Sequence, residues 1–263
     1  MDLAGVIAQL GGGQLFELSL DLYQGMPHHP VHPPFLYSMV RQHGTAKYAE
    51  GASSANDVFV CGGHSGTHID SLGHFSKDLV LRGGHRAGDV QSLQGGLKVF
   101  GMETVRPFLC RGVLLDVAAH RGEAVMAAGQ AINGRELEAT AKAQGVRIEP
   151  GAAVLVRTGW INRWEAGDYF SPEGAPGVDL SGARWLADHG IVLAGSDNYA
   201  FEVVPDLRKP VHCFLLIEKG IHMLEVANLE ALGRARCYEF FFAALPLKVR
   251  GATGCPVRAV AVA

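Results

Sequence analysis

Residues 64 to 74 read His64-Ser65-Gly66-Thr67-His68-Ile69-Asp70-Ser71-Leu72-Gly73-His74, which places three imidazoles and one carboxylate within eleven positions. Imidazole nitrogen and carboxylate oxygen are ligands that a borderline divalent ion such as Zn²⁺ or Mn²⁺ accepts. Three protein ligands leave room for water, as catalytic metal sites require. We therefore interpret His64, His68 and Asp70 as metal ligands.

The backbone that carries these ligands is predicted to be a loop at the end of a strand. Val58 to Cys61 is a short β-branched and aromatic run ended by two glycines, which predicts a buried strand that leads into the histidines. Gly66 argues against a plain helix with two histidines one turn apart, because glycine more often marks a bent backbone. A single loop histidine would more often be solvated than metal-bound. Three histidines and one aspartate together favour a metal site.

Two alternatives concern the rest of the site. A carboxylate near the distant His212, such as Glu225, is able to complete the ligand set, but sequence spacing alone does not bring this pair to residue 64, and each is ordinary by itself. A structural zinc site would need four closed ligands, usually including cysteines. The five cysteines are scattered and show no CxxC spacing, so a structural zinc domain is disfavoured.

The remaining elements predict a mixed α/β fold in a single domain over residues 1–263. Compact apolar runs at 15–22, 112–117, 153–157, 191–194 and 238–243 predict strands. A helix is predicted over 133–144, with Asn133 or Gly134 able to cap it, and another over 181–189, with Ser181 near its cap. The loop from Gly25 to Pro30, rich in proline and histidine, is expected to lie over another part of the molecule. There is no strict βαβ rhythm and no glycine-rich nucleotide-binding motif.

Composition favours a small-molecule substrate. Of the 263 residues, 48% are hydrophobic and 19% are charged, which suffices for a sizeable core. A net charge of −3 gives no broad positive field for nucleic acid or an anionic membrane surface. No apolar run approaches the roughly 20 residues of a bilayer span. The first basic residue is Arg41, unlike a secretory signal, and the odd number of cysteines fits reduced thiols, so we expect a cytoplasmic protein.

The stretch from His64 to His74 is similar to the HxGTHxDxPxH signature of the metal-dependent cyclase-like hydrolases, a family that includes bacterial kynurenine formamidase and isatin hydrolase. Five of the six signature side chains and the glycine match. Further stretches resemble family blocks: Leu18–Leu20, Arg111–Asp116, Arg157–Trp160, Gly195–Asp197 and Gly251–Pro256. The resemblance implies a mixed-sheet swivelling β/β/α fold of the cyclase family and a homodimer or larger homo-oligomer.

The resemblance also assigns roles to single residues. It implies that His64, His68 and Asp70 bind metal and that His74 moves protons. The family's later histidine and glutamate correspond to His212 and Glu225, so Glu225 is implied to be a ligand and His212 a ligand or a proton carrier. Formamidase-like members imply two ions, whereas isatin-hydrolase-like members imply one manganese. We expect a divalent ion, Mn²⁺ as first choice and Zn²⁺ as the alternative.

Two departures bear on the substrate. Leu72 stands where the formamidase signature has proline, and Cys255 stands where serine is expected, which puts the formamidase substrate in doubt. We therefore expect hydrolysis of a non-peptide carbon–nitrogen bond in a cyclic amide or imide, as in the opening of isatin to isatinate. The alternatives are arylformamidase activity on N-formylkynurenine, hydrolysis of a lactone or another cyclic imide, and an inactive binding protein. The aromatic residues that either line the pocket or fill the core are Phe35, Trp160, Trp164, Tyr199 and Phe201.

Overall fold

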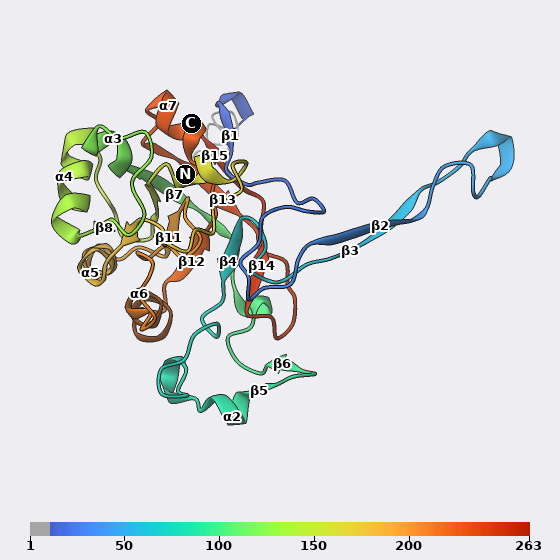
Figure 1. Cartoon of the computed structure of the whole chain (residues 1–263), viewed down its shortest axis with the longest axis horizontal. Helices are drawn as coiled ribbons and strands as arrows, with labels where there is room; N and C mark the ends of the chain where they lie inside the picture. Colours follow the sequence, from blue (N-terminus) through green and yellow to red (C-terminus); the bar gives the residue numbers. More distant parts are fainter. Residues whose placement is uncertain (1–10) are drawn as a thin grey trace.

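A curled nine-stranded mixed sheet forms the centre of the computed structural model, which describes residues 11–263 (Figure 1). Its strands, in spatial order, are β1 (Leu15–Glu17), β15 (Ala259–Val262), β13 (Glu239–Ala244), β7 (Phe108–Asp116), β9 (Ala153–Arg157), β11 (Leu193–Ser196), β12 (His222–Glu225), β4 (His68–Asp70) and β14 (Gly254–Pro256). The strands β7, β9, β11 and β12 are parallel to one another, and the other pairs are antiparallel. The predicted mixed α/β class is confirmed.

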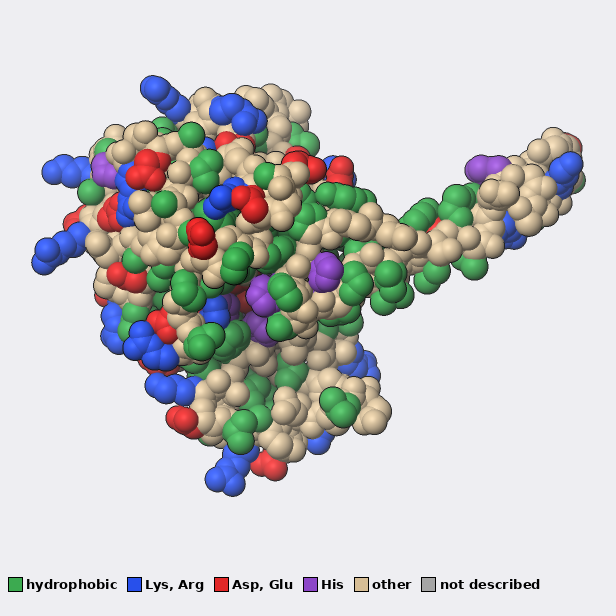
Figure 2. Space-filling view, in the orientation of Figure 1, with side chains coloured by type: hydrophobic (Ala, Val, Ile, Leu, Met, Phe, Trp, Pro, Cys, Tyr) green, Lys and Arg blue, Asp and Glu red, His purple; other side chains and the backbone are tan. Residues whose placement is uncertain are grey.

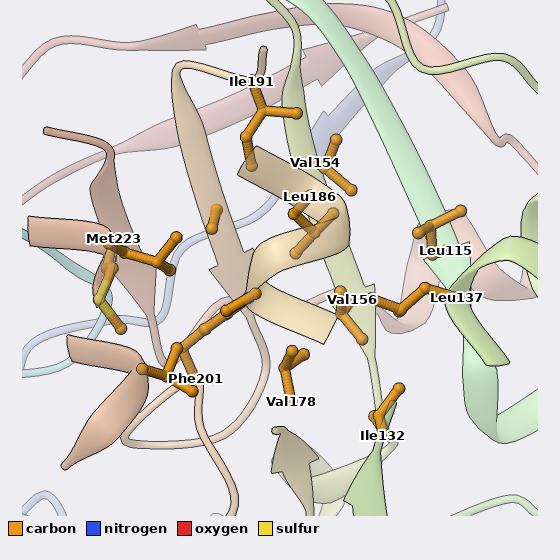
Figure 3. Close-up of a cluster of buried hydrophobic side chains, with 14 of the residues drawn as sticks. Leu115, Ile132, Leu137, Val154, Val156, Val178, Leu186, Ile191, Phe201 and Met223 are labelled. Atoms are coloured by element: carbon orange, nitrogen blue, oxygen red, sulfur yellow. The ribbon is translucent and has the colours of Figure 1, made fainter. Parts of the chain in front are cut away.

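The central strands bury both faces of the sheet. On one face, Val154 and Val156 of β9 point into an apolar cluster with Leu115, Leu137 and Leu186 (Figure 3). This face is covered by α3 (Val117–Arg121), α4 (Gly134–Gln144) and α5 (Leu180–Asp188). Intervening residues of the same strands enter a second cluster on the other face. Continuous apolar runs are therefore stable here, as parallel strands covered on both sides require.

Shorter elements surround this frame. They are β8 (Ala131–Ile132), β10 (Gly177–Val178), α2 (Ala87–Val90), β5 (Gln91–Ser92), β6 (Gly96–Leu97), α6 (Pro210–His212), the π-helix η5 (Cys213–Lys219), α7 (Glu230–Ala235) and the 3₁₀ turns η1 (Ala49–Gly51), η2 (Arg82–Gly84), η3 (Met102–Thr104) and η4 (Trp160–Arg163). Between residues 11 and 263, none of the helices has both the length and the apolar character needed to cross a membrane.

The helix predictions agree with the structure to within one residue at each end. In α4 the side chain of Asn133 accepts a hydrogen bond from the Glu136 N–H, so the predicted cap is confirmed. The helix α5 begins earlier than expected, because Asp179 and not Ser181 caps it through the Gly182 N–H. The strand predicted over 15–22 is shorter, since β1 ends at Glu17.

A two-stranded arm projects from the body of the molecule (Figure 1). It consists of β2 (Leu36–Arg41) and β3 (Asn56–Val60), which pair only with each other among the described strands. The expectation of a buried strand at 58–61 is wrong in its burial, because Val58, Phe59 and Val60 are 49%, 58% and 57% exposed. The strand exists, but an apolar run alone does not say which surface covers it.

Candidate metal centre

Strand β4 brings the first ligands next to a residue far along the chain. It lies between β12 and β14, antiparallel to both, and its His68 is directly opposite Glu225. Cross-strand partners point to the same face of a sheet. As a result, His68 Nε2 lies 3.4 Å from Glu225 Oε2 and 3.6 Å from Asp70 Oδ1.

His212 enters the same centre from the end of α6. Its Nε2 atom lies 3.3 Å from Glu225 Oε1 and 4.0 Å from Asp70 Oδ2. His64 Nδ1 lies 2.8 Å from Asp70 Oδ1, and the ring of His74 lies 4.1 Å, centroid to centroid, from that of His64. The structure thus gathers all six residues singled out in the sequence, while their individual roles stay predictions.

The donor atoms fall into two groups that share Asp70. One group contains His64, Asp70 and His74, the other contains Asp70, His212 and Glu225, and within each group the donor atoms lie within 4.8 Å of one another. His68 lies against both carboxylates. A shared carboxylate between two groups is compatible with one ion or with two neighbouring ions.

Buried donor atoms without hydrogen-bond partners fit a cation. Within residues 11–263, His68 Nε2, both carboxylate oxygens of Asp70 and Glu225 Oε1 have no hydrogen-bond partner. Leaving such atoms buried and unpaired is costly, so native proteins normally satisfy them with protein, water or an ion. Because the four atoms belong to side chains in mutual contact and are typical hard or borderline ligands, the residues present fit a divalent metal ion.

A second contact orients each of three imidazoles. His68 Nδ1 lies 2.8 Å from the Gly66 carbonyl oxygen, and His64 Nε2 lies 3.0 Å from Thr253 Oγ1. His212 Nδ1 contacts the Glu202 carboxylate. Such outer contacts select the tautomer and leave the other ring nitrogen free to bind metal. His68 and His212 therefore present Nε2, and His64 presents Nδ1, to the carboxylates.

Glu202 and Thr253 are residues of the centre that the sequence did not indicate. Glu202 is 1% exposed, accepts a hydrogen bond of 2.9 Å from the Val211 N–H, and has Lys209 Nζ 3.8 Å away. Thr253 lies in a stretch that resembles a family block but carries no motif of its own. Glycine at 254 is required by close approach, since a Cβ there would lie 2.5 Å from His64 Cε1.

Burial and neighbouring charges shift the pKa values of His74 and His212 in opposite directions. Burial lowers the pKa of His74 to about 3, although Asp70 opposes this change. Burial acts in the same sense on His212, but the neighbouring carboxylates of Glu202 and Glu225 raise its pKa to about 9. Burial favours the neutral form of Glu225, yet His212 and His68 lower its pKa to about 2. Without metal, the centre therefore holds a neutral His74 beside a protonated His212 at neutral pH.

A cavity of about 590 Å³ opens onto the centre, and its wall includes six imidazole rings and three aromatic rings. His29 and Pro30, from the loop rich in proline and histidine, and the adjoining His32 form part of its wall, so the expectation that this loop lies over another region is confirmed. The ring of His32 stacks on that of His64 with centroids 5.2 Å apart. Figure 2 shows histidine side chains gathered on this face near the root of the arm.

The aromatic residues divide between the cavity and the core. Of the five candidates from the sequence, Tyr199 lines the cavity. The other four, each at most 6% exposed, are core residues: Phe35, Trp160, Trp164 and Phe201. Phe75 and Phe170 also line the cavity, although the sequence did not indicate them. Phe75 lies 4.4 Å from His212, centroid to centroid, and Phe170 lies 5.1 Å from Tyr199.

Comparison with known proteins gives a consistent family. A family model described as "Putative cyclase" matches residues 16–203. A kynurenine formamidase from Bacillus cereus is 27% identical over 197 residues, which is 75% of this chain and 75% of that protein. A crystal structure described as a novel cyclase superposes with a TM-score of 0.90 at 27% identity, covering 99% of this chain and 90% of that one.

The fold is also that of isatin hydrolases. Isatin hydrolase A from Ralstonia solanacearum superposes with a TM-score of 0.76 at 23% identity, covering 100% of this chain and 97% of that one. At this identity the likeness shows the fold alone. Membership of the family is shown by the family model, which matches more than half of the chain. This protein is therefore a metal-dependent hydrolase of the putative cyclase family.

Proposed function

We propose that this protein hydrolyses a carbon–nitrogen bond in a small flat cyclic amide or imide of the isatin type, with Mn²⁺ as its first-choice ion and Zn²⁺ as the alternative. The observation that carries the proposal is the position of the donor groups: the centre built around Asp70 opens onto a cavity lined by aromatic rings. Flat apolar rings favour a flat substrate, because stacked or edge-on aromatic contacts stabilise it.

Metal binding and proton transfer are assigned to different residues of the chain. His64, His68, Asp70, His212 and Glu225 would hold the ion. A divalent ion at such a site supplies Lewis acidity, lowers the pKa of water to about 7 and polarises a carbonyl. His74 is held neutral by burial, so its ring is able to take a proton from water and deliver it to the departing nitrogen. The loop with His29 and His32 shields the reacting groups from bulk water.

Arylformamidase activity is the second candidate, and the kinship to a kynurenine formamidase at 27% identity favours it. N-formylkynurenine differs from isatin in carrying an amino-acid tail with a carboxylate. Lys209 lines the cavity and is the basic side chain placed to pair with that carboxylate. The two candidates therefore make different demands on Lys209.

The test is turnover of isatin, followed by loss of its visible absorbance, in parallel with hydrolysis of N-formylkynurenine. Protein stripped of metal is reloaded with Mn²⁺ or Zn²⁺ separately. Metal-dependent turnover of isatin alone is the expected result. Turnover of the formamide alone would assign the second candidate, and failure on both would overturn both.

A Lys209→Met variant sharpens the comparison. If the substrate is an uncharged cyclic amide, its KM should change little. If the substrate is the formamide, loss of the ion pair should raise KM several-fold while kcat changes less, because the contact is remote from the reacting bond. Lys219→Met, on η5 and outside the residues that line the cavity, is the matched control.

A further inference from the structure

Val226, the residue directly after Glu225, has a backbone conformation that its side chain disfavours. Its φ angle is 58°, in the left-handed region. A β-branched residue rarely adopts this conformation, because its Cβ crowds the neighbouring carbonyl group. Such strain persists only where the surrounding structure fixes it. Since β12 ends at Glu225, the strained turn is the first backbone feature beyond a carboxylate of the metal centre.

Three contacts hold Val226 in this conformation. Its N–H donates a hydrogen bond of 2.9 Å to the carbonyl oxygen of Asn198. Its own carbonyl oxygen accepts a hydrogen bond of 2.7 Å from Thr67 Oγ1. Its side chain is 3% exposed and belongs to an apolar cluster with Trp160 and Tyr169. Within residues 11–263, Thr67 is the one side chain that hydrogen-bonds to the backbone of Val226.

Strand pairing places Thr67 at this turn. The strands β4 and β12 are antiparallel neighbours, with His68 directly opposite Glu225 (Figure 1). Thr67 precedes His68 and Val226 follows Glu225, so the two residues meet just beyond the last backbone pair. The backbone N–H of Val226 is turned away toward Asn198, and the Thr67 hydroxyl supplies the missing link between the strands.

The hydroxyl of Thr67 has no proton left for another role. Thr67 is 2% exposed and does not line the cavity of the metal centre. Its oxygen accepts a hydrogen bond of 3.0 Å from the Leu20 N–H, and its single proton is donated to Val226. Contact with a substrate or proton transfer to one is therefore excluded for this side chain. Any effect of Thr67 on the centre must pass through its neighbours.

We propose that Thr67 is a positioning residue, whose hydroxyl keeps Val226 in the left-handed conformation and thereby fixes the Glu225 carboxylate for metal binding. Without this hydrogen bond, Val226 relaxes toward an extended backbone and turns the peptide that joins it to Glu225. The Glu225 oxygens, 3.4 Å from His68 Nε2 and 3.3 Å from His212 Nε2, then leave the other donor atoms. The inference rests on the proposed metal centre, in which Glu225 is a ligand.

The test is the dissociation constant for Mn²⁺, measured by competition with a chelator. Thr67→Val removes the hydroxyl at nearly constant size and should raise Kd about 10- to 100-fold, the usual effect of losing a residue that orients a ligand. Thr67→Ser keeps the hydroxyl and should bind as wild type does. Thr140→Val is the matched control, because Thr140 is also buried and donates to a carbonyl oxygen, that of Glu136 in α4. Its Kd should not change.

Glycine at position 226 separates positioning from a general loss of stability. Glycine adopts left-handed conformations readily, so it does not need the Thr67 hydrogen bond to form the turn. Val226→Gly should bind Mn²⁺ as wild type does, and Thr67→Val/Val226→Gly should regain most of the affinity lost in Thr67→Val. A double variant that binds as weakly as Thr67→Val would show that Thr67 does not act through Val226, which overturns the proposal.

Two further results would also overturn it: a Thr67→Val variant that binds as tightly as Thr140→Val, or a Thr67→Ser variant that binds as weakly as Thr67→Val. Glu225→Gln distinguishes these failures from failure of the proposed function. Wild type that binds neither Mn²⁺ nor Zn²⁺, or Glu225→Gln with wild-type affinity, would contradict the metal centre itself and the role of Thr67 with it. Circular dichroism checks folding, and Thr67→Ala replaces Thr67→Val if the valine variant does not fold.

Discussion

His74 and His212 show how one centre gives two histidines opposite properties. Burial lowers the pKa of His74, whereas the carboxylates of Glu202 and Glu225 raise that of His212 despite its burial. A neutral ring suits proton transfer, and a ring held by a carboxylate on its far side suits metal binding. The two roles are separable by substitution.

Replacement of His74 by alanine should leave metal in place and lower kcat about 10²- to 10⁴-fold, the usual contribution of a general acid or base. Metal content by mass spectrometry and kcat at saturating substrate measure the two effects. His85→Ala is the control, because its ring packs on Phe100 and is not among the residues that line the cavity. Loss of metal from His74→Ala would instead make His74 a ligand in the group with His64 and Asp70.

Glu202→Gln should lower metal affinity about 10- to 100-fold, the usual effect of losing an outer carboxylate partner. The amide keeps the size of the side chain and an acceptor oxygen but removes the negative charge, so the contact that fixes the tautomer of His212 is weakened. Titration with Mn²⁺ and Zn²⁺ in the presence of a competing chelator measures the change. Glu218→Gln, on the exposed end of η5, should not alter affinity. Equal affinities for the two variants would remove Glu202 from the centre.

Stability of the metal-free protein should peak near pH 6.5. The pKa of His212 is raised from 6.5 to about 9, so the stability that its charge contributes is complete below pH 6.5 and is lost as pH rises to 9. The pKa of His74 is lowered to about 3, so its contribution is complete above pH 6.5 and is lost as pH falls toward 3.

Thermal unfolding of chelator-treated protein from pH 3 to pH 10 tests this expectation. In His212→Gln the loss of stability at alkaline pH should be smaller than in wild type. The loss of stability at acid pH should be unchanged. An alkaline side that is identical in wild type and His212→Gln would show that another group causes it.

At the level of secondary-structure elements, local patterns in the sequence predicted individual elements, whereas contacts between distant elements depend on strand register and on the path of the chain. The cap of α4 follows from neighbouring residues and agrees with the structure. The expectation that the ligands lie on a loop is wrong for His68 and Asp70, because both belong to strand β4. Glu225 lies beside His68 only because β12 pairs with β4 in one register. Glu202 approaches His212 only through the path of the chain between β11 and α6, so no sequence pattern reveals it.

Asp197 makes another contact between elements that are distant in sequence, because it joins the ends of β9 and β11. It is fully buried and accepts hydrogen bonds from the Thr158 N–H at 2.9 Å, the Thr158 hydroxyl at 2.6 Å and the Gly159 N–H at 2.7 Å. In the sequence, the stretch Gly195–Asp197 resembled a family block, but no role could be assigned to it. Its carboxylate holds the two strand ends together.

Asp197→Asn should therefore lower the free energy of unfolding by about 1–3 kcal/mol, the cost of unpaired buried groups. The amide keeps one acceptor oxygen and turns an N–H₂ group toward backbone donors. Urea unfolding measures the change. Asp188→Asn, exposed at the end of α5, should stay within about 0.5 kcal/mol of wild type. A similar result for both variants would contradict this role.

On the scale of the whole molecule, the centre joins parts of the chain that are far apart in sequence. Its donors come from the loop before β4, from β4 itself, from the end of α6 and from β12. Without metal, the carboxylates and imidazoles are buried with unpaired atoms, so the native state carries an electrostatic cost at the place where these elements meet. An ion that binds only the native state removes that cost.

Metal binding should therefore stabilise the entire fold. At a free-ion concentration of 100 times Kd, native-state binding adds about 2.7 kcal/mol, or roughly 5–10 °C in Tm for a chain of this size. Calorimetry with chelator, Mn²⁺ or Zn²⁺ measures the shift. Asp70→Asn should unfold at a Tm that does not respond to either ion, because it removes the carboxylate common to both donor groups. A full shift in Asp70→Asn would mean that the ion acts elsewhere on the chain, since stabilisation requires binding and binding at this centre requires Asp70.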